Sequence, residues 1–510
     1  MAIVAYTPLI GVLAIVSWIA YSLVQSKLKA RKYNMPNRVP GVPIFGNTFQ
    51  IPLDTPSQAV WATENAKKYG EMFTVQLGTK DWVFLNSSRV VNELMEKRAS
   101  NYSSRMEQPM VQDIISGGRR IVMMPYNERW RALRKIMHSI LNSTHLNLYA
   151  EYQDLETKQL LWDYLQEPTN WHRANQAFTN SVIMSVVFGR RLRPNDPNLT
   201  PLFRQAEAFV KNIQPGSNLV DGYPILARLP TALQWWRPRG EALYRESVRV
   251  YKYEVDLIRS KIATGSPPAC FAVYFLKSVE KSDMDEEQKY FALGSLMEAG
   301  SDTSRMTMSQ IIAATVLQPD WVARARQALD AVCGDAERLP TFDDKGRLQI
   351  ITGVVKEGLR WFPFNPIGFP TMCSADDGFE GYKWPAGTIF TWNNQYLCRT
   401  GEEYEDPERF WPERWYGEDL DKVLKGHWSF GPGRRVCVGY NVAQTNLWIA
   451  IARLLYCFDF KPVEGRPIEI DKIEWGHWEQ PHFAVDIKPR SEKHRQLIVR
   501  ECGGVSDVVY

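Results

Sequence analysis

One short stretch, FGPGRRVCVGY at residues 430–440, limits the possible folds of this chain more than any other. Its single thiol, Cys437, has glycines on both sides, and glycines let backbone amides approach a side chain closely. The next segment, residues 441–458, places leucines and isoleucines on one helical face. The thiol is therefore expected just before a helix N-terminus, where the dipole and free N–H groups favour a thiolate.

The surroundings of Cys437 favour one chemistry over three others. The glycines do not match the phosphate-binding pattern G-x-G-x-x-G. A nucleophilic cysteine needs a base, and the candidate, His427, lies ten residues upstream and is expected to be an exposed loop histidine. One cysteine supplies too few ligands for zinc. Axial ligation of haem iron, to which a thiolate donates electron density, fits a lone cysteine best.

Composition and charge are typical of a globular protein that does not bind nucleic acid. Of the 510 residues, 45% are hydrophobic and 23% are charged. The 61 basic and 57 acidic residues are interspersed and give a net charge of only +4. The 7 cysteines form no CxxC pair, which indicates reduced thiols in a protein that faces the cytosol.

The N-terminus has a different character from the rest of the chain. Residues 1–26 carry no charge and are followed directly by KLKARK. A helix of about 20 apolar residues spans a bilayer, and basic residues beside it stay in the cytoplasm. The sequence predicts a transmembrane anchor at 1–26, a basic and proline-rich linker at 27–54, a cytosolic catalytic domain at 55–500 and a tail at 501–510.

The periodicity of the body predicts helices with a few short strands. Residues 55–360 are mostly helical in pattern. Strand-like runs occur near 72–86 and towards the C-terminus, in GTIFTWN and HFAVDIK. We expect a mainly α fold with small β-sheets, built as a single large domain behind the anchor.

The cysteine loop also resembles a known signature. Phe430, Gly433, Arg435, Cys437 and Gly439 stand as F-x-x-G-x-R-x-C-x-G, which is similar to the haem-binding motif of the cytochrome P-450 superfamily. The resemblance implies the P-450 fold and haem b as cofactor. It implies that Cys437 is the axial iron ligand, that Arg435 binds a haem propionate, and that Phe430 packs near the thiolate.

Other motifs follow in the order that this family has. In EGLR, Glu357 and Arg360 share a helical face and can form an ion pair. With Arg414 of FWPERW they resemble the Glu-Arg-Arg cluster that locks the haem-side core of the family. In ERWRALRK, Trp130 and Arg134 lie four apart and resemble the pair that binds the haem propionates.

The stretch AGSDTS at 299–304 lies inside a long apolar helix, although Gly300, Asp302 and Thr303 are poor residues for a helix interior. Taken alone, it indicates an exposed polar patch or a small kink. The resemblance implies that it crosses the haem and that Asp302 and Thr303 supply protons for dioxygen activation. Glu298, one turn earlier, is expected to be structural.

One position departs from the family pattern. Many relatives carry a histidine or arginine near the positions of Thr371 and Met372, where it helps to bind a propionate. This sequence has neither there. The contact is either lost or supplied by another part of the chain.

The resemblance also implies a reaction and its partners. The chain looks like fungal microsomal monooxygenases of the endoplasmic reticulum membrane that oxidise hydrophobic, aromatic or polyketide-type secondary metabolites. No second nucleotide motif is present, so electrons are expected from a separate NADPH-dependent reductase. Arg131 and Lys135 could form a docking patch for that donor or a solvated helix face.

Two alternatives to monooxygenation stay open. The first is oxidative phenol coupling, which joins two aromatic molecules without oxygen insertion. The second is a haem protein that only carries electrons or senses a gas, which would need no proton-delivery pair. The segments expected by resemblance to line the pocket are apolar, which suits a flat hydrophobic substrate; they are 103–118, Met297 with Ala299, 364–369 and 475–483.

Overall fold

The computed structural model describes residues 17, 32–42, 45–142, 147–192, 199–477 and 479–508. Apart from residue 17, the anchor expected at 1–26 lies outside this part of the chain. Within the described residues, no helix combines the length and the apolar character needed to cross a membrane.

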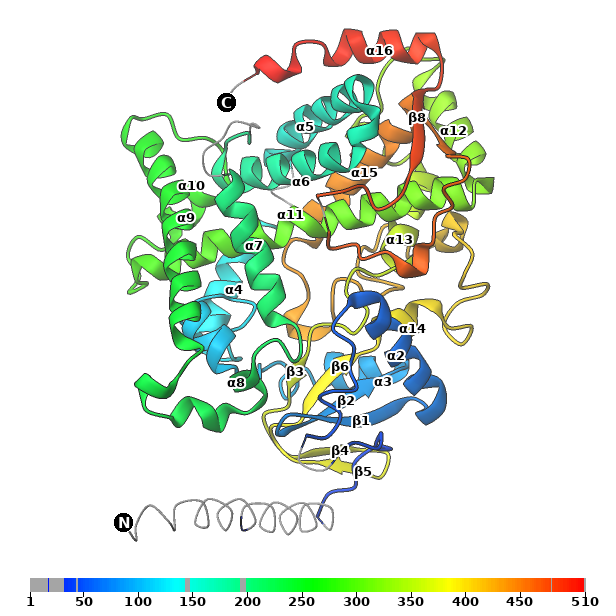
Figure 1. Ribbon diagram of the computed structural model, residues 1–510. Helices are drawn as coiled ribbons and strands as arrows, with labels where there is room; N and C mark the ends of the chain where they lie inside the picture. Colours follow the sequence, from blue (N-terminus) through cyan, green and yellow to red (C-terminus); the bar gives the residue numbers. More distant parts are fainter. Residues whose placement is uncertain are drawn as a thin grey trace.

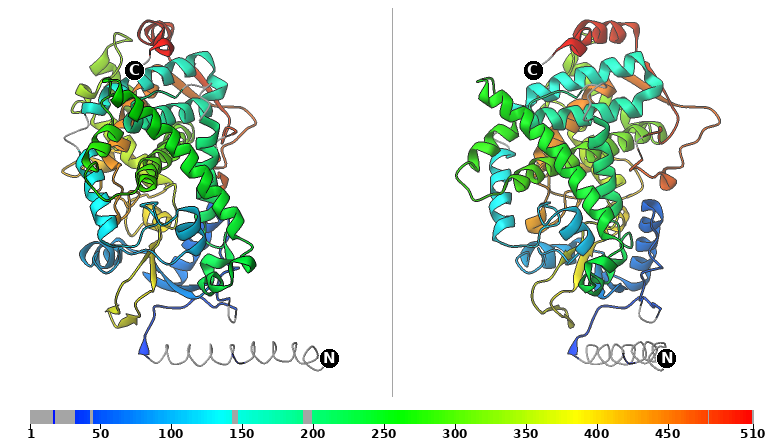
Figure 2. Two further views of the ribbon diagram at one scale, coloured as in Figure 1. Left: turned by 90° about the vertical axis from the view of Figure 1, so that its left-hand side faces the viewer. Right: turned by 60° about the vertical axis from the view of Figure 1, so that its left-hand side comes forward.

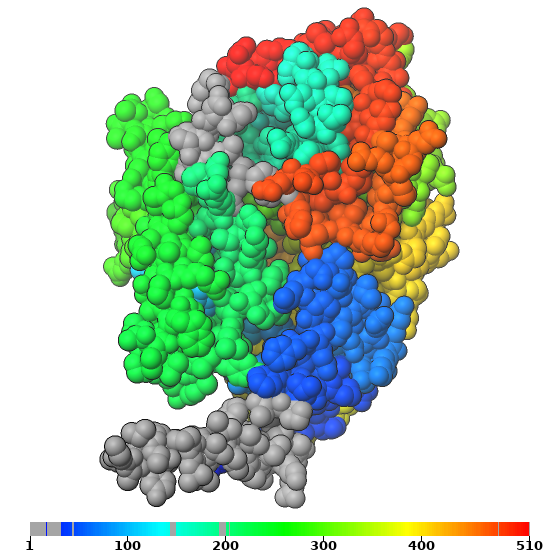
Figure 3. All heavy atoms as spheres, viewed as in Figure 1, coloured from blue at the N-terminus to red at the C-terminus, as the bar shows by residue number. Residues whose placement is uncertain are grey.

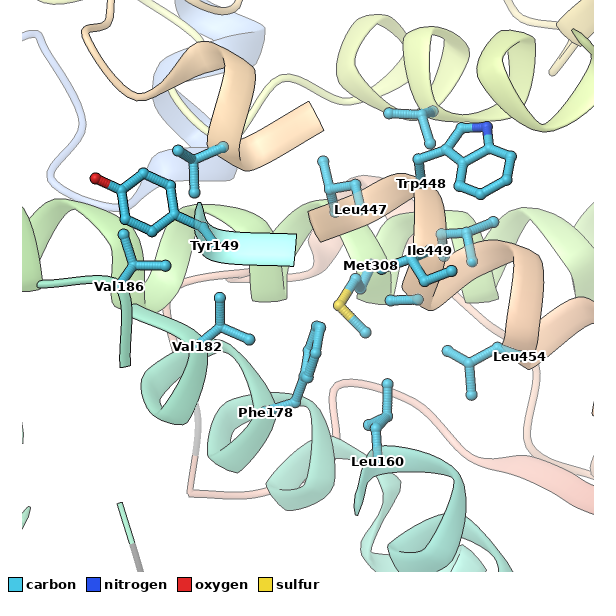
Figure 4. Packing of buried hydrophobic residues seen from close by; sticks show 14 of the residues in the cluster. Tyr149, Leu160, Phe178, Val182, Val186, Met308, Leu447, Trp448, Ile449 and Leu454 are labelled. Carbon is cyan, nitrogen blue, oxygen red and sulfur yellow. The ribbon is translucent and has the colours of Figure 1, made fainter. Parts of the chain in front are cut away.

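A layer of long helices forms the centre of the molecule (Figure 1). The central helix α11 (Glu286–Leu317) runs through the body, and α6 (Trp171–Phe188) lies along it. Helices α5 (Asn147–Gln166), α15 (Tyr440–Cys457) and α13 (Gln349–Trp361) pack around this pair. Their apolar faces meet in the main core, where Phe178 of α6, Met308 of α11 and Leu447 of α15 point toward one another (Figure 4).

Further helices cover one side of this layer (Figure 2). They are α7 (Leu199–Ile213), α9 (Arg237–Ala263), α10 (Phe271–Ser278) and α4 (Glu128–Ile140). The shorter or peripheral helices are α2 (Thr55–Tyr69), α3 (Ser88–Val91), α8 (Leu219–Gly222), α12 (Asp320–Cys333), α14 (Asn394–Arg399) and α16 (Glu492–Cys502).

A small mixed sheet lies at the opposite end of the molecule from α16 (Figure 1). Strands β1 (Met72–Leu77) and β2 (Lys80–Leu85) are antiparallel, and β6 (Ile389–Trp392) pairs in parallel with β2. Strand β3 (Thr371–Met372) pairs antiparallel with β6, which gives the order β1-β2-β6-β3. Two hairpin-like pairs complete the strands: β4 (Asp377–Phe379) with β5 (Tyr382–Trp384), and β7 (Phe458–Pro462) with β8 (Val485–Pro489).

The architecture confirms the expected mainly helical single domain with small sheets. The predicted strands near 72–86 and near the C-terminus are present as β1, β2, β6 and β8. Two segments that were expected outside the catalytic domain pack against it. Val39 N–H donates to Thr74 O on β1 over 2.9 Å. Helix α16 continues past residue 501, where the tail was expected to begin, and its last residue, Cys502, is fully buried.

Candidate active site

The cysteine loop is a tight turn held by its own backbone. The Cys437 N–H donates to Phe430 O over 2.8 Å, and Val436 N–H donates to Gly433 O over 3.1 Å. Gly433 has φ +67°, and a Cβ at this position would lie 2.2 Å from Met95 O. Only glycine fits there. The loop delivers Cys437 two residues before Gly439, the N-cap of α15.

The Cys437 thiol borders a hollow inside the protein. It is the exposed cysteine of the chain, and the other 6 cysteines are buried. Protein atoms nevertheless surround it, and this burial raises the pKa of the Cys437 thiol, while the Gly439 N–H and Arg134 act in the opposite direction. A thiol that is accessible yet lies deep in the protein leaves room for a bound group on its open side.

Three guanidinium groups gather near this loop without any carboxylate. Within the described residues, Arg105, Arg134 and Arg435 form no ion pair, although 7% or less of the Arg105 surface is exposed. Burial, reinforced by Arg134, lowers the pKa of Arg435 to about 9. Burial and the nearby Arg435 hold the pKa of Arg105 well below its usual range. Uncompensated charge of this kind is costly unless an anion binds there.

The predicted pair Trp130 and Arg134 meets Arg435 at this cluster. The Asn127 side chain caps α4 by accepting from Trp130 N over 2.9 Å, which sets the start of the helix. The Arg435 guanidinium lies 4.3 Å from the Trp130 ring centroid, and that of Arg134 lies 5.8 Å from it. Arg134 also donates to Val436 O in the cysteine loop. Tertiary packing thus joins two of the predicted motifs.

Arg105 lies against the segment near Thr371 in which the expected basic residue is missing. It donates to Phe369 O over 3.3 Å and to Pro370 O, and its Nε donates to Val122 O over 2.8 Å. The neighbouring Ser104 pairs with Met372 across a β-bridge. The Thr371 hydroxyl beside it is buried and makes no hydrogen bond within the described residues. Arg105 therefore brings a positive charge to β3 from elsewhere in the chain.

The polar stretch of α11 is more accessible than the rest of the helix. The helix is unbroken there, and Thr303 Oγ1 donates to Ala299 O over 3.1 Å. Ala299 is exposed, although most of the helix is buried. Gly300 has no space for a side chain, because a Cβ would lie 2.5 Å from Ile183 Cδ1. Ala299 is therefore accessible and Thr303 partly accessible, while Gly300 lets α6 pack closely against α11.

Asp302 is held by an arginine that the motif did not indicate. Arg305 Nε donates to Asp302 Oδ1 over 3.2 Å. The same guanidinium donates to the carbonyls of Trp475, Gly476 and His477 over 3.1 to 3.3 Å. Arg305 is 1% exposed, and burial lowers its pKa. It fixes the Asp302 carboxylate against the C-terminal segment.

Glu298 is engaged in a buried ion pair, in keeping with the structural role expected for it. Arg120 Nε and Nη2 donate to its two oxygens over 2.9 and 2.7 Å. Tyr251 of α9 also donates to Glu298, and the Arg120 guanidinium lies 4.0 Å from the Phe209 ring centroid on α7. These contacts join the loop of Arg120, α9 and α7 to α11.

The predicted cluster of Glu357, Arg360 and Arg414 is assembled in the structure. Glu357 and Arg360 are fully buried on α13 and joined by two hydrogen bonds, of 2.7 and 3.0 Å. Arg414 Nε reaches Glu357 Oε1 at 3.1 Å. Trp411 N and Trp415 Nε1 donate to the same carboxylate at 2.9 Å each.

The expectation that His427 is exposed was wrong. The residue is 5% exposed, because Trp415 and Phe430 pack on its ring with centroids 6.1 and 5.8 Å away. Burial, together with Lys356 and Arg360, lowers the pKa of His427 to about 3. Its Nε2 makes no hydrogen bond within the described residues, so it does not activate Cys437.

A separate groove of about 530 Å³ lies between α2 and α14. Phe364, Pro366 and Trp475 form part of its wall, and these belong to segments expected to line the substrate pocket. None of the residues at the cysteine loop or on α11 borders it. We therefore place the candidate site at the accessible Cys437 and at the polar turn of α11, and not in this groove.

Sequence reasoning missed Arg105, Arg305 and Arg120. Arg105 and Arg120 act on residues far away in the chain. Arg305 pairs with Asp302 three residues before it and also binds carbonyls of the distant C-terminal segment. None of the three belongs to a motif. The signal in the sequence was indirect: a basic residue was absent near Thr371, and its replacement had to come from another segment.

Comparisons with known proteins agree with this geometry. A family model described as "Cytochrome P450" matches residues 36–482. The cytochrome P450 monooxygenase fogE of Aspergillus ruber is 31% identical over 500 residues, covering 95% of this chain and 92% of the relative. The cytochrome P450 monooxygenase polD of Polytolypa hystricis is 31% identical over 477 residues, covering 91% and 92%. A solved zebra fish cytochrome P450 with abiraterone superposes with a TM-score of 0.68 at 20% identity, covering 85% of this chain and 100% of that chain.

Proposed function

The chain belongs to the cytochrome P450 family and is an oxidoreductase of the monooxygenase kind, and we propose that it oxidises a small hydrophobic, aromatic or polyketide-type metabolite. The oxidant is dioxygen, and electrons come from a separate NADPH-dependent reductase. The single observation that carries this proposal is the accessible Cys437 thiol beside a cluster of unpaired guanidinium groups.

The residues present fit haem, the cofactor that the family implies. Haem carries two propionates, and the cluster of Arg105, Arg134 and Arg435 lacks any anion within the described residues. The Thr371 hydroxyl is likewise buried without a partner beside Arg105. We propose that these three arginines and Trp130 hold the propionates and that Cys437 ligates the iron. When bound, haem supplies a thiolate-ligated iron that activates dioxygen for insertion into an unreactive bond.

The protein's own part in the reaction is to hold the substrate and to supply protons. The Thr303 hydroxyl donates to Ala299 O, and rotation about its C–O bond would direct the proton to a neighbouring group instead. Arg305 orients the carboxylate of Asp302, the residue next to Thr303. We propose that Asp302 passes protons to Thr303, and general acid catalysis of this kind contributes about 10²- to 10⁴-fold in rate. A haem protein that only carries electrons would not need this pair.

Replacing Arg105 with methionine is expected to change apoprotein stability and haem affinity in opposite directions. Without haem the guanidinium is a buried, unpaired charge, and its removal should stabilise the apoprotein by about 1–4 kcal/mol. With haem the same change removes a charged hydrogen bond to a propionate, so haem affinity should fall by about tenfold or more. Haem titration of the apoprotein and urea unfolding measure the two effects.

Arg105→Lys serves as the matched variant because it keeps the positive charge but lacks the planar guanidinium group, which can bind a carboxylate through two parallel hydrogen bonds. Its haem affinity should lie between those of the native protein and Arg105→Met. Equal haem affinity in all three proteins would exclude Arg105 from the propionate contacts.

The reaction itself is either oxygen insertion or phenol coupling, and we propose oxygen insertion. The wall segments around Arg105 and Phe369 combine buried apolar residues, such as Met110, Val111 and Ile367, with buried polar ones. Their apolar part suits a flat hydrophobic substrate. Incubation of an aromatic polyketide under ¹⁸O₂ is expected to place one labelled atom in the product. A dimeric product without label would instead establish coupling.

We further propose that the protein is held at the endoplasmic reticulum membrane by an anchor at 1–26 and the linker at 27–54, with residues 55–500 in the cytosol. Exposed apolar side chains support contact with a lipid surface. Phe45 packs on Tyr223, and Leu53 faces Gly216, so two segments far apart in sequence form one surface (Figure 3). The exposed apolar side chains of these two segments, each more than one third exposed, are Phe45, Phe49, Leu53, Leu219, Ile225, Leu233 and Trp235.

A further inference from the structure

Two buried hydrogen-bond donors of the small sheet have no acceptor. Thr371 on β3 is 2% exposed, and Trp392 at the end of β6 is 6% exposed. Neither the Thr371 hydroxyl nor Trp392 Nε1 makes a hydrogen bond within the described residues. An indole nitrogen can only donate, and a buried donor without an acceptor destabilises a protein. A group that accepts hydrogen bonds at this place would therefore bind favourably.

The two donors lie on one face of the sheet. Thr371 on β3 stands directly opposite Phe390 on the neighbouring strand β6 (Figure 1). Trp392 follows Phe390 by two residues, so its side chain leaves the strand on the same side. Diagonal neighbours of this kind are within reach of a long aromatic side chain. Thr391, between them on β6, points to the opposite face and donates to Ile367 O.

The Trp392 indole packs between the cysteine loop and the segment that leads into β3. A Cβ added at Gly431 of the loop would lie 3.4 Å from Trp392 Cη2. A Cβ added at Gly368 would lie only 2.6 Å from Trp392 Cδ2, so the backbone there lies directly on the ring. Phe430, next to Gly431, accepts the hydrogen bond from the Cys437 N–H. Trp392 therefore packs against the turn that presents Cys437.

Two consecutive carbonyl groups connect Thr371 to the arginine cluster. Ser103 O accepts a hydrogen bond from Arg435 Nε over 2.7 Å. Ser104 O accepts one from the N–H of Met372, the residue after Thr371, over 2.9 Å. The two donors without an acceptor are thus in the same region as the guanidinium groups without a carboxylate.

A carboxylate suits both of these features. It carries negative charge, and its two oxygens accept about four hydrogen bonds. We propose that the Thr371 hydroxyl and the Trp392 indole N–H donate to a haem propionate, at the place where many relatives have a histidine or arginine. The inference rests on the proposed function, because it assigns neutral donors to the propionate contact that this sequence lacks.

Neutral donors have an advantage at this particular place. Arg105 and Arg435 are already buried there without a counter-charge. A third buried cation would add to the free-energy cost of the protein before haem binds. A hydroxyl and an indole N–H bind a carboxylate without adding charge.

Two probes that differ only at the propionates test the assignment. The protein is loaded either with haem or with haem dimethyl ester, and the loss of each group to an excess of apomyoglobin is timed. Thr371→Val and Trp392→Phe each remove one donor and keep a similar shape. Each should speed the loss of haem about tenfold and the loss of the ester much less, because hydrogen bonds to a charged acceptor are the stronger ones. The ratio of the two rates should rise about fivefold or more.

Thr391→Val is the matched control for this measurement. It removes the same hydroxyl group one residue away, on the opposite face of β6, where the hydroxyl is already bonded to Ile367 O. It should lower the midpoint of urea unfolding, because a buried carbonyl loses its donor. The ratio of the two loss rates should equal that of the native protein.

An unchanged ratio in Thr371→Val or in Trp392→Phe would overturn the inference, because a purely structural role affects the loss of haem and of its ester alike. The absorption spectrum of the reduced, CO-bound native protein tests the proposed function separately. Absence of the thiolate band there would overturn the proposed function. A normal band together with unchanged ratios would overturn only the role of Thr371 and Trp392.

Discussion

Replacing Cys437 with serine is expected to abolish the absorption band that a thiolate-ligated haem gives when reduced and bound to CO. A serine hydroxyl does not ionise near neutral pH, so it cannot donate electron density to iron as the thiolate does. Monooxygenase activity should fall by about a thousandfold, which corresponds to about 4 kcal/mol in the barrier. Difference spectroscopy and NADPH-dependent product formation measure the two effects.

The other cysteines provide the control for this experiment. Cys373 is buried, and its thiol donates to Pro385 O over 3.2 Å, away from the cysteine loop. Cys373→Ala should therefore retain the thiolate band. If the band survived in Cys437→Ser, the proposed ligand would be wrong, and another group would have to hold the iron.

Replacing Glu357 with glutamine is expected to destabilise the fold by about 3–5 kcal/mol. The native carboxylate accepts five hydrogen bonds, from Arg360 twice, Arg414, Trp411 N and Trp415 Nε1. Glutamine has one acceptor oxygen, and its amide would point N–H groups at donors. Two buried guanidinium groups would also lose their counter-charge. The midpoint of urea unfolding measures the loss.

A surface pair serves as the matched control for Glu357. Glu492 accepts from Arg495 one turn away on α16, and both side chains are exposed. Water and salt screen such a pair, so Glu492→Gln should leave the urea midpoint unchanged. If Glu357→Gln behaved in the same way, the buried cluster would not contribute to stability.

Local spacing was enough to predict the helix pairs and the strands. Glu357 and Arg360 stand three residues apart on α13, and Trp130 and Arg134 stand four apart on α4. Helical periodicity brings such residues to one face whatever the rest of the chain does. The short, mostly apolar runs that form β1 and β2 are equally local. These features therefore follow from short-range geometry.

Contacts between distant segments required the structure. Arg105 reaches Pro370 from 265 positions away, and Arg120 reaches Glu298 from 178 positions away. Periodicity carries no information about which loop packs on which helix. His427 shows the same limit, because its loop position indicated exposure and the packing of Trp415 and Phe430 buries it.

The sequence by itself determined the chemistry of this protein, because the loop around Cys437 and the ordered motifs after it specify residue types at fixed short spacings. Only the tertiary structure decided how the charges are arranged. It brought Arg105 to β3, paired Arg120 with Glu298 and tied Arg305 to the carbonyls of the C-terminal segment. The reason is physical: burial and charge pairing depend on which segments meet in space, and many sequences can satisfy one local pattern.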